Sequence, residues 1–257
     1  MDNKKPLILI TNDDGHQAKG INELIESVKG LGEIVVVAPD GPRSGMSSAI
    51  TSLQPLRAHL IKDETDLKIY SCTGTPVDCV KLGITELAKR KPDIVLSGIN
   101  HGSNAAVAVL YSGTMGAAME GAVFKIPSVG FSLLDHDYQA DFSACHKYTR
   151  ILTSQVLKDG LPSGTCLNVN IPKGHDIKGL KICRQTSGKW TNEFVLSKDG
   201  ANKQIYWLTG EFTNDEPHDE NTDEWALAHN YVSVVPVKVD MTNHDYLEPI
   251  RAWENLV

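Results

Sequence analysis

Short apolar runs alternate with amphipathic helical stretches along the first two thirds of the chain. Residues 7–10 and 33–38 have the length and composition of buried strands, and apolar positions over 21–28 recur at helical spacing before Gly30. An apolar run without polar alternation is typical of a parallel strand that is covered on both faces. Two such strands joined by a helix predict a right-handed βαβ unit.

The same alternation continues and predicts an α/β fold with a mainly parallel sheet and helices on both faces. Thr75 followed by Pro76 is typical of a helix start, which places a helix from there to about residue 88. Further helices are expected after Ser112, at 142–157 and, as a short terminal helix, at 246–254. Further strands are expected at 51–61, 67–71, 93–99, 127–133, 166–171, 178–183 and 232–239.

The composition changes after about residue 186. Residues 187–223 are rich in tryptophan, charge and turn formers, which indicates an antiparallel hairpin extension with a mobile acidic loop at 214–220. We therefore expect a core at 1–185, followed at 186–257 by the hairpin extension, a final strand returning to the core, and a C-terminal oligomerisation helix. Trp190, Trp207 and Trp253 on such projecting elements favour an oligomer interface.

Charge and cysteine content exclude several classes of protein. The 257 residues are 41% hydrophobic, enough for a sizeable core, and the net charge of -7 argues against nucleic-acid or membrane partners. Five widely spaced cysteines predict free thiols in a reducing cytoplasm. The polar segment 1–6 does not resemble a signal peptide, and no apolar run approaches the roughly 18 residues that a membrane helix needs.

Oxygen-bearing side chains follow three of the predicted core strands. Asp13 and Asp14 come directly after the first strand, Ser44 lies in the loop after the second, and Asn100 follows the strand at 93–99. Ligands collect at the carboxyl ends of parallel strands, and oxygen donors suit one divalent cation, Mg²⁺ or Mn²⁺, with Ca²⁺ as a substitute. The alternative for residues 12–15 is a simple turn with a capping carboxylate.

A helix start at Ser112 offers a place for an anion. Small residues at Gly113, Gly116 and Ala117 allow backbone amides to approach a ligand, and the N-terminus of a helix carries a partial positive charge. Close packing of the helix on the sheet would explain the same residues equally well. The spacing is not that of a Walker loop, because no GKS or GKT sequence is present.

Five ordered blocks of sequence stand out. They are ILITNDDG at 8–15, AP at 38–39 with SGMS at 44–47, GTPVDCV at 74–80, PDIVLSGIN at 92–100 and SGTMGAAMEG at 112–121. Together they resemble one known family, the SurE (survival protein E) 5′/3′-nucleotidases. Thr222 and Asp223, and then Val239 to Thr242, resemble later landmarks of that family, whereas residues 190–220 depart from it.

The resemblance implies a Rossmann-like three-layer core and hydrolysis of nucleoside 5′- and 3′-monophosphates, with short polyphosphate as a further substrate. It implies one divalent metal ion per subunit, held by Asp13, Asp14, Ser44 and Asn100, and a homodimer or homotetramer formed by exchange of C-terminal elements. His101 is expected to be a surface histidine. Substrate phosphate is expected at Asn12, Gly45, Asn104, Ser112, Gly113 and Thr114.

The chemistry expected from these residues is attack on phosphorus by activated water, with Asp13 or Asp14 accepting the proton. Attack by Asp13 through an aspartyl-phosphate is the rival route. A nucleotide-sensing module with little or no turnover is the alternative function. A dinucleotide-dependent oxidoreductase is disfavoured, because no G-x-G-x-x-G follows the first strand and the acidic pair would repel a pyrophosphate.

Overall fold

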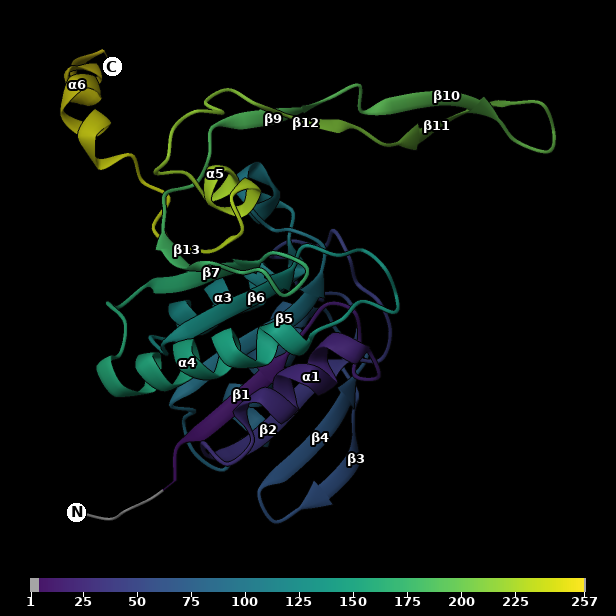
Figure 1. The fold of residues 1–257 in the computed structure, drawn as a ribbon, viewed down its shortest axis with the longest axis vertical. Coiled ribbons are helices and arrows are strands. Elements are labelled where there is room, and N and C mark those ends of the chain that lie inside the picture. The colour runs from purple at the N-terminus through teal and green to yellow at the C-terminus, as the bar shows by residue number, and fades with distance from the viewer. Residues whose placement is uncertain (1–4, 257) are drawn as a thin grey trace.

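A computed structural model describes residues 5–256 of the chain, built on one nine-stranded sheet (Figure 1). Most of the polar N-terminal segment 1–6, and residue 257, lie outside this range. The strands of the sheet are β1 (Leu7–Thr11), β2 (Glu33–Pro39), β3 (Ala58–Glu64), β4 (Leu67–Cys72), β5 (Ile94–His101), β6 (Ser128–Leu133), β7 (Thr165–Ile171), β8 (Gly179–Ile182) and β13 (Tyr231–Lys238).

The strand order is β3-β4-β2-β1-β5-β6-β7-β13-β8, with β1 near the centre. The pairs from β4 through β7 are parallel, which confirms the mainly parallel sheet. β3 runs antiparallel to β4, and β13 runs antiparallel to β7 but parallel to β8. The last strand of the chain is therefore an interior strand, and residues beyond 186 belong partly to the main sheet.

Helices cover both faces of the sheet, as the buried apolar strands require. The pair α1 and α4 packs on one face, and α2 and α3 pack on the other (Figure 1). Two buried apolar clusters separate the helices from the sheet, one on each face, and every residue of β1 is buried. The helices are α1 (Lys19–Val28), α2 (Pro76–Leu82), α3 (Gly113–Val123), α4 (Ser143–Asp159), α5 (Asp223–Ala228) and α6 (Leu247–Arg251).

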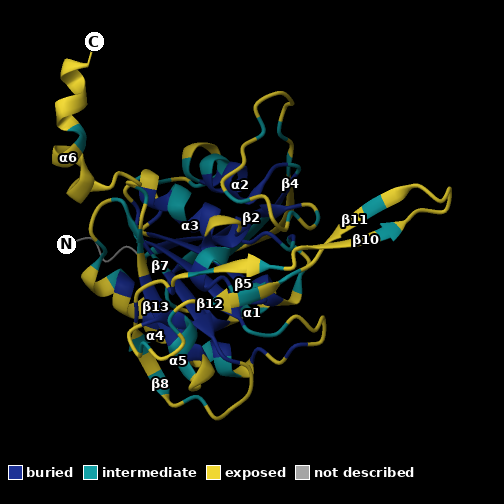
Figure 2. Ribbon diagram, turned by 90° about the horizontal axis from the view of Figure 1, so that it is seen from above, coloured by how far each residue is buried: buried dark blue, intermediate teal, exposed yellow. Residues whose placement is uncertain are grey.

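A long two-stranded arm, residues 188–214, projects from the core as the predicted hairpin extension (Figure 1). Its base pairs β9 (Gly188–Thr191) with β12 (Glu211–Asn214), and its outer part pairs β10 (Phe194–Lys198) with β11 (Gln204–Leu208). The arm and α6 are largely exposed, whereas the central strands of the sheet are buried (Figure 2).

The start of α2 shows how the sequence fixes one element and its neighbour. Thr75 and Asp78 form a reciprocal capping box, and Pro76 occupies the first turn. The Asp78 carboxylate also accepts from the backbone N of Thr51 at 3.1 Å. Burial would raise the pKa of Asp78, but the hydrogen bonds from Thr51 and Thr75 outweigh it and lower that pKa.

Several element boundaries differ from those expected. The strand expected at 51–61 begins only at Ala58, because the preceding segment contains Pro55 and is held by Asp78 instead of by a neighbouring strand. α2 ends at Leu82 and continues as one π turn, Gly83–Leu87. The terminal helix is one short α-helical turn between two 3₁₀ turns. The helix α5 was not anticipated.

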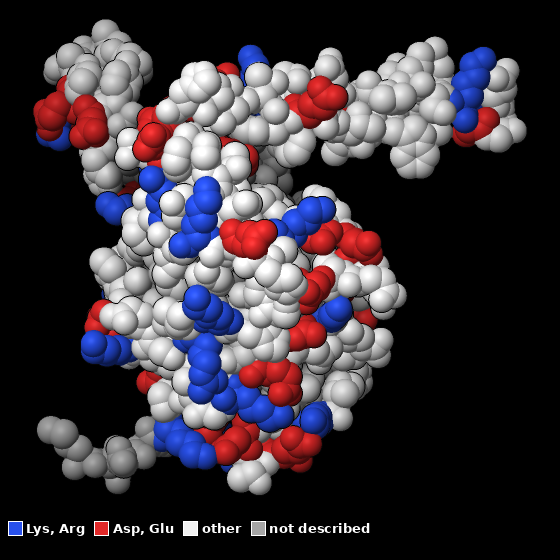
Figure 3. All heavy atoms as spheres, in the orientation of Figure 1, with Lys and Arg blue, Asp and Glu red and all other residues white. Residues whose placement is uncertain are grey.

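The described surface mixes both signs of charge. Lys and Arg are interspersed with Asp and Glu on the face seen in Figure 3, and much of the arm on that face carries no charged side chain. Cys72, Cys79, Cys145, Cys166 and Cys183 are free and buried. Within residues 5–256, no helix is both long enough and apolar enough to cross a membrane.

Candidate active site

The turn after β1 directs two carboxylates to the carboxyl edge of the sheet. The Asn12 side chain closes this turn, donating to the Gly15 carbonyl at 2.9 Å and accepting from the Gly15 N at 3.2 Å. Gly15 adopts a φ of +99°, which favours glycine. Asn12 is thus buried in the turn and does not line the adjacent cavity, so its expected contact with phosphate has no geometric support.

The loop that carries Ser44 is attached to the rest of the site on both sides. The Arg43 N donates to the Asp13 carbonyl at 2.7 Å, which joins the loop to the end of β1. The Ser47 hydroxyl donates to the Leu110 carbonyl at 2.6 Å, which joins it to the segment before α3. Ser44 and Gly45 therefore face the same cavity as Asp13.

Asn100 reaches the site through an irregularity in β5. The pairing of β5 with β6 changes register between Ser97 and Asn100, and such a bulge redirects a side chain next to a binding site. The Asn100 Nδ2 donates to the Gly102 carbonyl at 2.9 Å. Its Oδ1 is then the atom left to act as an oxygen ligand.

The N-terminus of α3 abuts Asp13. The Ser112 hydroxyl caps the helix by accepting from the Met115 N at 3.0 Å, and the Thr114 hydroxyl donates to Asp13 Oδ1 at 2.6 Å. A Cβ at Gly113 would lie 2.9 Å from the Cβ of Asp13, and one at Gly116 would lie 2.3 Å from a backbone oxygen of the Ser44 loop. The small residues therefore allow close packing, and this packing brings the first helical amides beside Asp13.

A buried ladder of amide side chains positions Asn104. Its backbone N donates to Asn170 Oδ1 and its Nδ2 donates to the Ser132 hydroxyl, both at 2.8 Å. Its carbonyl accepts from Asn168 Nδ2, also at 2.8 Å. These partners lie on β6 and β7, and no local pattern in the sequence identified them as supports of the site.

One cavity of about 630 Å³ joins these elements. Of the expected site residues, Asn12, Asp14, Gly113 and Thr114 do not line it. Those that do are Asp13, Ser44, Gly45, Asn100, Asn104 and Ser112. The sequence did not identify the other lining residues, which are His101, Gly102, Ser103, Ala108, Tyr111 and His136 from the core and Trp190, Glu193, Leu208 and Thr209 from the arm.

Burial makes the two carboxylates unstable as a bare anionic pair. Burial raises the pKa of Asp13 to about 6 despite the hydrogen bond from Thr114, and the neighbouring Asp14 charge raises it further. Burial also raises the pKa of Asp14, with His101 opposing the shift. Asp14 Oδ2 is buried without a hydrogen-bond partner. A buried carboxylate oxygen that lacks a partner is expected where a cation binds.

The donors fit a hard divalent cation. Two carboxylates, one hydroxyl and one amide oxygen belong to the residues predicted as metal ligands, and such oxygen donors suit Mg²⁺ or Mn²⁺. Within residues 5–256, no cluster of three or more His, Cys, Asp or Glu side chains could hold a metal.

His101 is less exposed than expected. Its Nδ1 lies 3.1 Å from the Asp137 carbonyl, and its ring packs edge-on against Phe142 with the centroids 5.0 Å apart. It lines the cavity next to Asn100 instead of standing on the open surface. These contacts orient the ring at the rim of the site.

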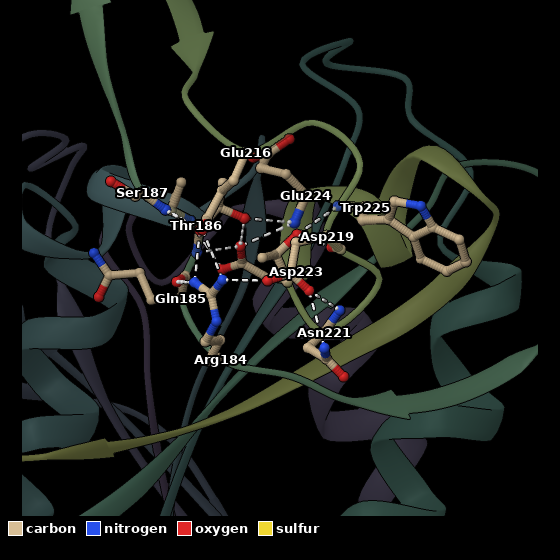
Figure 4. Close-up of polar contacts among 12 residues, drawn as sticks. Arg184, Gln185, Thr186, Ser187, Glu216, Asp219, Asn221, Asp223, Glu224 and Trp225 are labelled. Carbon is tan, nitrogen blue, oxygen red and sulfur yellow. Dashed lines mark hydrogen bonds and ion pairs between the residues drawn. The ribbon is translucent and has the colours of Figure 1, made fainter.

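A second polar cluster, centred on buried Asp223, supports the loop that carries Asn104 (Figure 4). Asp223 Oδ2 accepts from the Ala106 N at 2.9 Å, and Oδ1 accepts from the Thr186 N and the Glu224 N, both at 2.9 Å. The Thr186 hydroxyl also donates to Oδ1 at 2.5 Å. Ala106 has a φ of +49°, so this contact holds a strained backbone position.

The acidic loop expected to be mobile is tied to the same cluster. Arg184 donates to both Glu216 carboxylate oxygens and to Asp219, each at 2.6 Å (Figure 4). Paired bonds of this kind fix the orientation of both partners. The loop therefore has a defined attachment to the strand segment that precedes the arm.

Several known proteins resemble this chain over most of its length. A family model described as "Survival protein SurE" matches residues 8–192. The 5′-nucleotidase SurE of Phocaeicola vulgatus is 52% identical over 253 residues and covers 98% of each chain. That of Bacteroides fragilis is 50% identical over 254 residues, covering 99% of this chain and 100% of that protein.

A solved structure agrees with the fold as well. The crystal structure of the Sure protein from Aquifex aeolicus matches with a TM-score of 0.83 at 40% identity, over 97% of this chain and 100% of that one. The likeness extends over nearly the whole length of both chains. This chain therefore belongs to the SurE family.

Proposed function

We propose that the chain is a divalent-metal-dependent phosphomonoesterase that hydrolyses nucleoside 5′- and 3′-monophosphates to nucleoside and phosphate. The observation that carries the proposal is the single cavity in which Asp13, Ser44 and Asn100 meet beside the N-terminus of α3. Three separate segments of chain deliver these oxygen donors to one place. Membership of a family whose relatives are named 5′-nucleotidases supports the same chemistry.

Different residues would bind the phosphate and accept the proton. Ser112 and Asn104, which both line the cavity, would contact phosphoryl oxygens, and the N-terminus of α3 beside them adds a partial positive charge. Asp13, with a pKa near 6, is largely deprotonated at neutral pH and can accept a proton from attacking water. The first turn of α3 then stabilises charge that develops on the phosphoryl oxygens.

Asp13, Asp14, Ser44 and Asn100 are the residues that would hold the cation. When bound, a divalent cation would polarise the phosphoryl group, lower the pKa of water in the site and return both carboxylates to their charged form. The partnerless Asp14 Oδ2 supports its inclusion, although Asp14 does not line the cavity itself.

Release of inorganic phosphate from AMP, GMP and short polyphosphate, with Mg²⁺, with Mn²⁺ and with chelator, tests the proposal directly. We expect activity with either cation and its loss on chelation. Asp14→Asn should reduce kcat by at least about 100-fold, because the neutral amide is a weaker ligand for a hard cation. Asp63→Asn is the matched control, since Asp63 lies on β3 and pairs with Lys68.

The outcomes separate the proposal from its rivals. Near-normal turnover of Asp14→Asn would overturn the ligand assignment. Tight nucleotide binding without turnover would favour a sensing module. Incorporation of solvent ¹⁸O into the Asp13 carboxylate during turnover would favour an aspartyl-phosphate route over direct attack by water.

We extend the proposal to self-association as a homodimer or homotetramer. Large apolar side chains lie exposed on the arm and at the C-terminus, with Trp207 61% and Trp253 62% exposed. Exposed aromatic side chains of this kind are typical of interfaces. Light scattering after size exclusion tests it, and a monomer at micromolar concentration would contradict it.

A further inference from the structure

The cavity at the candidate site extends well beyond the residues that would handle a phosphate. Part of its wall comes from the arm, through Trp190 on β9, Leu208 at the end of β11 and Thr209 just after it. The strand β9 contacts the 3₁₀ turn Ala106–Leu110, which leads to Ser112. The arm is therefore attached beside the phosphate end of the site.

The volume of the cavity fits a ligand larger than phosphate. About 630 Å³ is within the range of sites that hold whole small molecules. Asp13, Ser44, Asn100 and Ser112 of the core line this cavity together with the residues of the arm. A substrate whose phosphate lies beside Asp13 would therefore extend its remaining part toward the arm.

Trp190 is the aromatic side chain that the arm gives to this cavity. Its ring packs edge-on against Phe212, with the centroids 6.0 Å apart and the planes at 67°. This contact fixes the indole while 37% of the residue stays accessible to solvent. A fixed and partly exposed indole is a stacking surface for a flat heteroaromatic ring.

Most of the arm lies outside the segment that identifies the family. The family match ends at residue 192, two positions after Trp190, so Glu193, Leu208 and Thr209 all follow it. The phosphate end of the cavity is built from blocks inside the match.

We infer that Trp190 determines specificity by stacking on the nucleobase of a nucleoside monophosphate, with the arm forming the nucleoside wall of the site. The inference rests on the proposed function and adds the part of the substrate that the arm recognises. Trp190 touches the base and not the reacting phosphoryl group. Its removal should therefore weaken binding of nucleotides and leave the reaction of a base-free phosphate ester unchanged.

Steady-state kinetics on two substrates test this. AMP and ribose 5-phosphate carry the same 5′-phosphate ester, and only AMP carries a base. Trp190→Ala should lower kcat/KM for AMP by about 5- to 100-fold, mainly through KM, because stacking on an aromatic side chain contributes that much per base. For ribose 5-phosphate kcat/KM should be unchanged, and Trp190→Phe should recover most of the activity on AMP.

Trp207→Ala is the matched control. Trp207 is a tryptophan of the same arm, is 61% exposed and does not line the cavity, so its loss should leave both substrates unaffected. Equal losses on AMP and ribose 5-phosphate in Trp190→Ala would indicate a structural role and overturn the inference. Unchanged kinetics on AMP would overturn it as well.

Calorimetry separates this inference from the proposed function. If the wild-type protein hydrolyses neither substrate, the proposed function fails, and the dissociation constant for AMP then decides the role of Trp190. A 5-fold or greater weakening in Trp190→Ala, with none in Trp207→Ala, would support stacking. Equal affinity in all three proteins would refute it.

Discussion

Replacing Asp223 tests whether the C-terminal part of the chain holds the active-site loop in place. The carboxylate is buried, and its two oxygens divide four donors unequally: Oδ2 accepts from Ala106, and Oδ1 accepts from Thr186 and Glu224. In Asp223→Asn the amide oxygen should take the Oδ1 position because three donors point there. The amide NH₂ would then face the Ala106 N and break that contact selectively.

The expected loss in the free energy of unfolding follows from the buried donors that are left without a hydrogen-bond acceptor. Each unsatisfied buried donor costs about 1–3 kcal/mol, so Asp223→Asn should destabilise the fold by about 1–3 kcal/mol. Asp223→Ala removes the acceptor for the backbone N of both Ala106 and Thr186, and should cost about 2–6 kcal/mol. Both variants should remain folded if the total stability lies in the usual range of about 5–15 kcal/mol.

Urea unfolding measures the cost, and hydrogen exchange at the Ala106 amide reports the contact itself. Asp223→Asn should lose protection at Ala106 while Thr186 keeps it, and phosphate release should fall by about tenfold as Asn104 and Ser112 lose their support. Ala106→Gly added to Asp223→Asn should restore part of the stability, because glycine adopts a positive φ readily. Full protection and normal turnover in Asp223→Asn would refute the reasoning.

Three further predictions concern other parts of the fold. Burial would raise the pKa of Asp78, but its hydrogen bonds lower it. The carboxylate therefore contributes its full stabilisation above about pH 4, and this stabilisation is lost as pH falls through the folded-state pKa. In urea unfolding, Asp78→Asn should lower the stability by about 1–3 kcal/mol at pH 7, and the difference from the wild-type protein should shrink below pH 4. Gly113→Ala should push against Asp13 and lower kcat by about tenfold or more, whereas Gly200→Ala, which meets nothing within 4 Å, should not. Burial raises the pKa of the Cys166 thiol to about 12. Alkylation of this thiol at pH 8 should therefore be slow in the folded protein and fast in urea. Equal alkylation rates in the two conditions would contradict the burial of Cys166.

Sequence patterns predicted the layered core because apolar runs and helical spacing report burial directly. Leu7–Thr11 is buried on both faces as its composition requires, and the capped start of α2 appears where Thr75 and Pro76 place it. The misplaced strand start before Ala58 reflects a contact made across 27 residues, between Thr51 and Asp78. Local composition cannot predict a contact between residues so far apart in the sequence.

The residues of the candidate site also fall into two groups, those that the sequence could predict and those that it could not. Asp13, Ser44 and Asn100 could be predicted to share a cavity because parallel strands end at one edge of a sheet. The wall that contains Trp190 could not, since the direction in which a projecting hairpin leaves the core depends on tertiary contacts. Asp223 likewise meets Ala106 across 117 positions of sequence.

The interior position of β13 has a consequence for biosynthesis. Residues 231–238 leave the ribosome after both β7 and β8, yet they separate these two strands in the finished sheet. Until they arrive, β7 presents an open edge that can pair with another nascent chain. A premature stop codon before residue 231 would therefore yield an aggregation-prone product instead of a shortened but working protein.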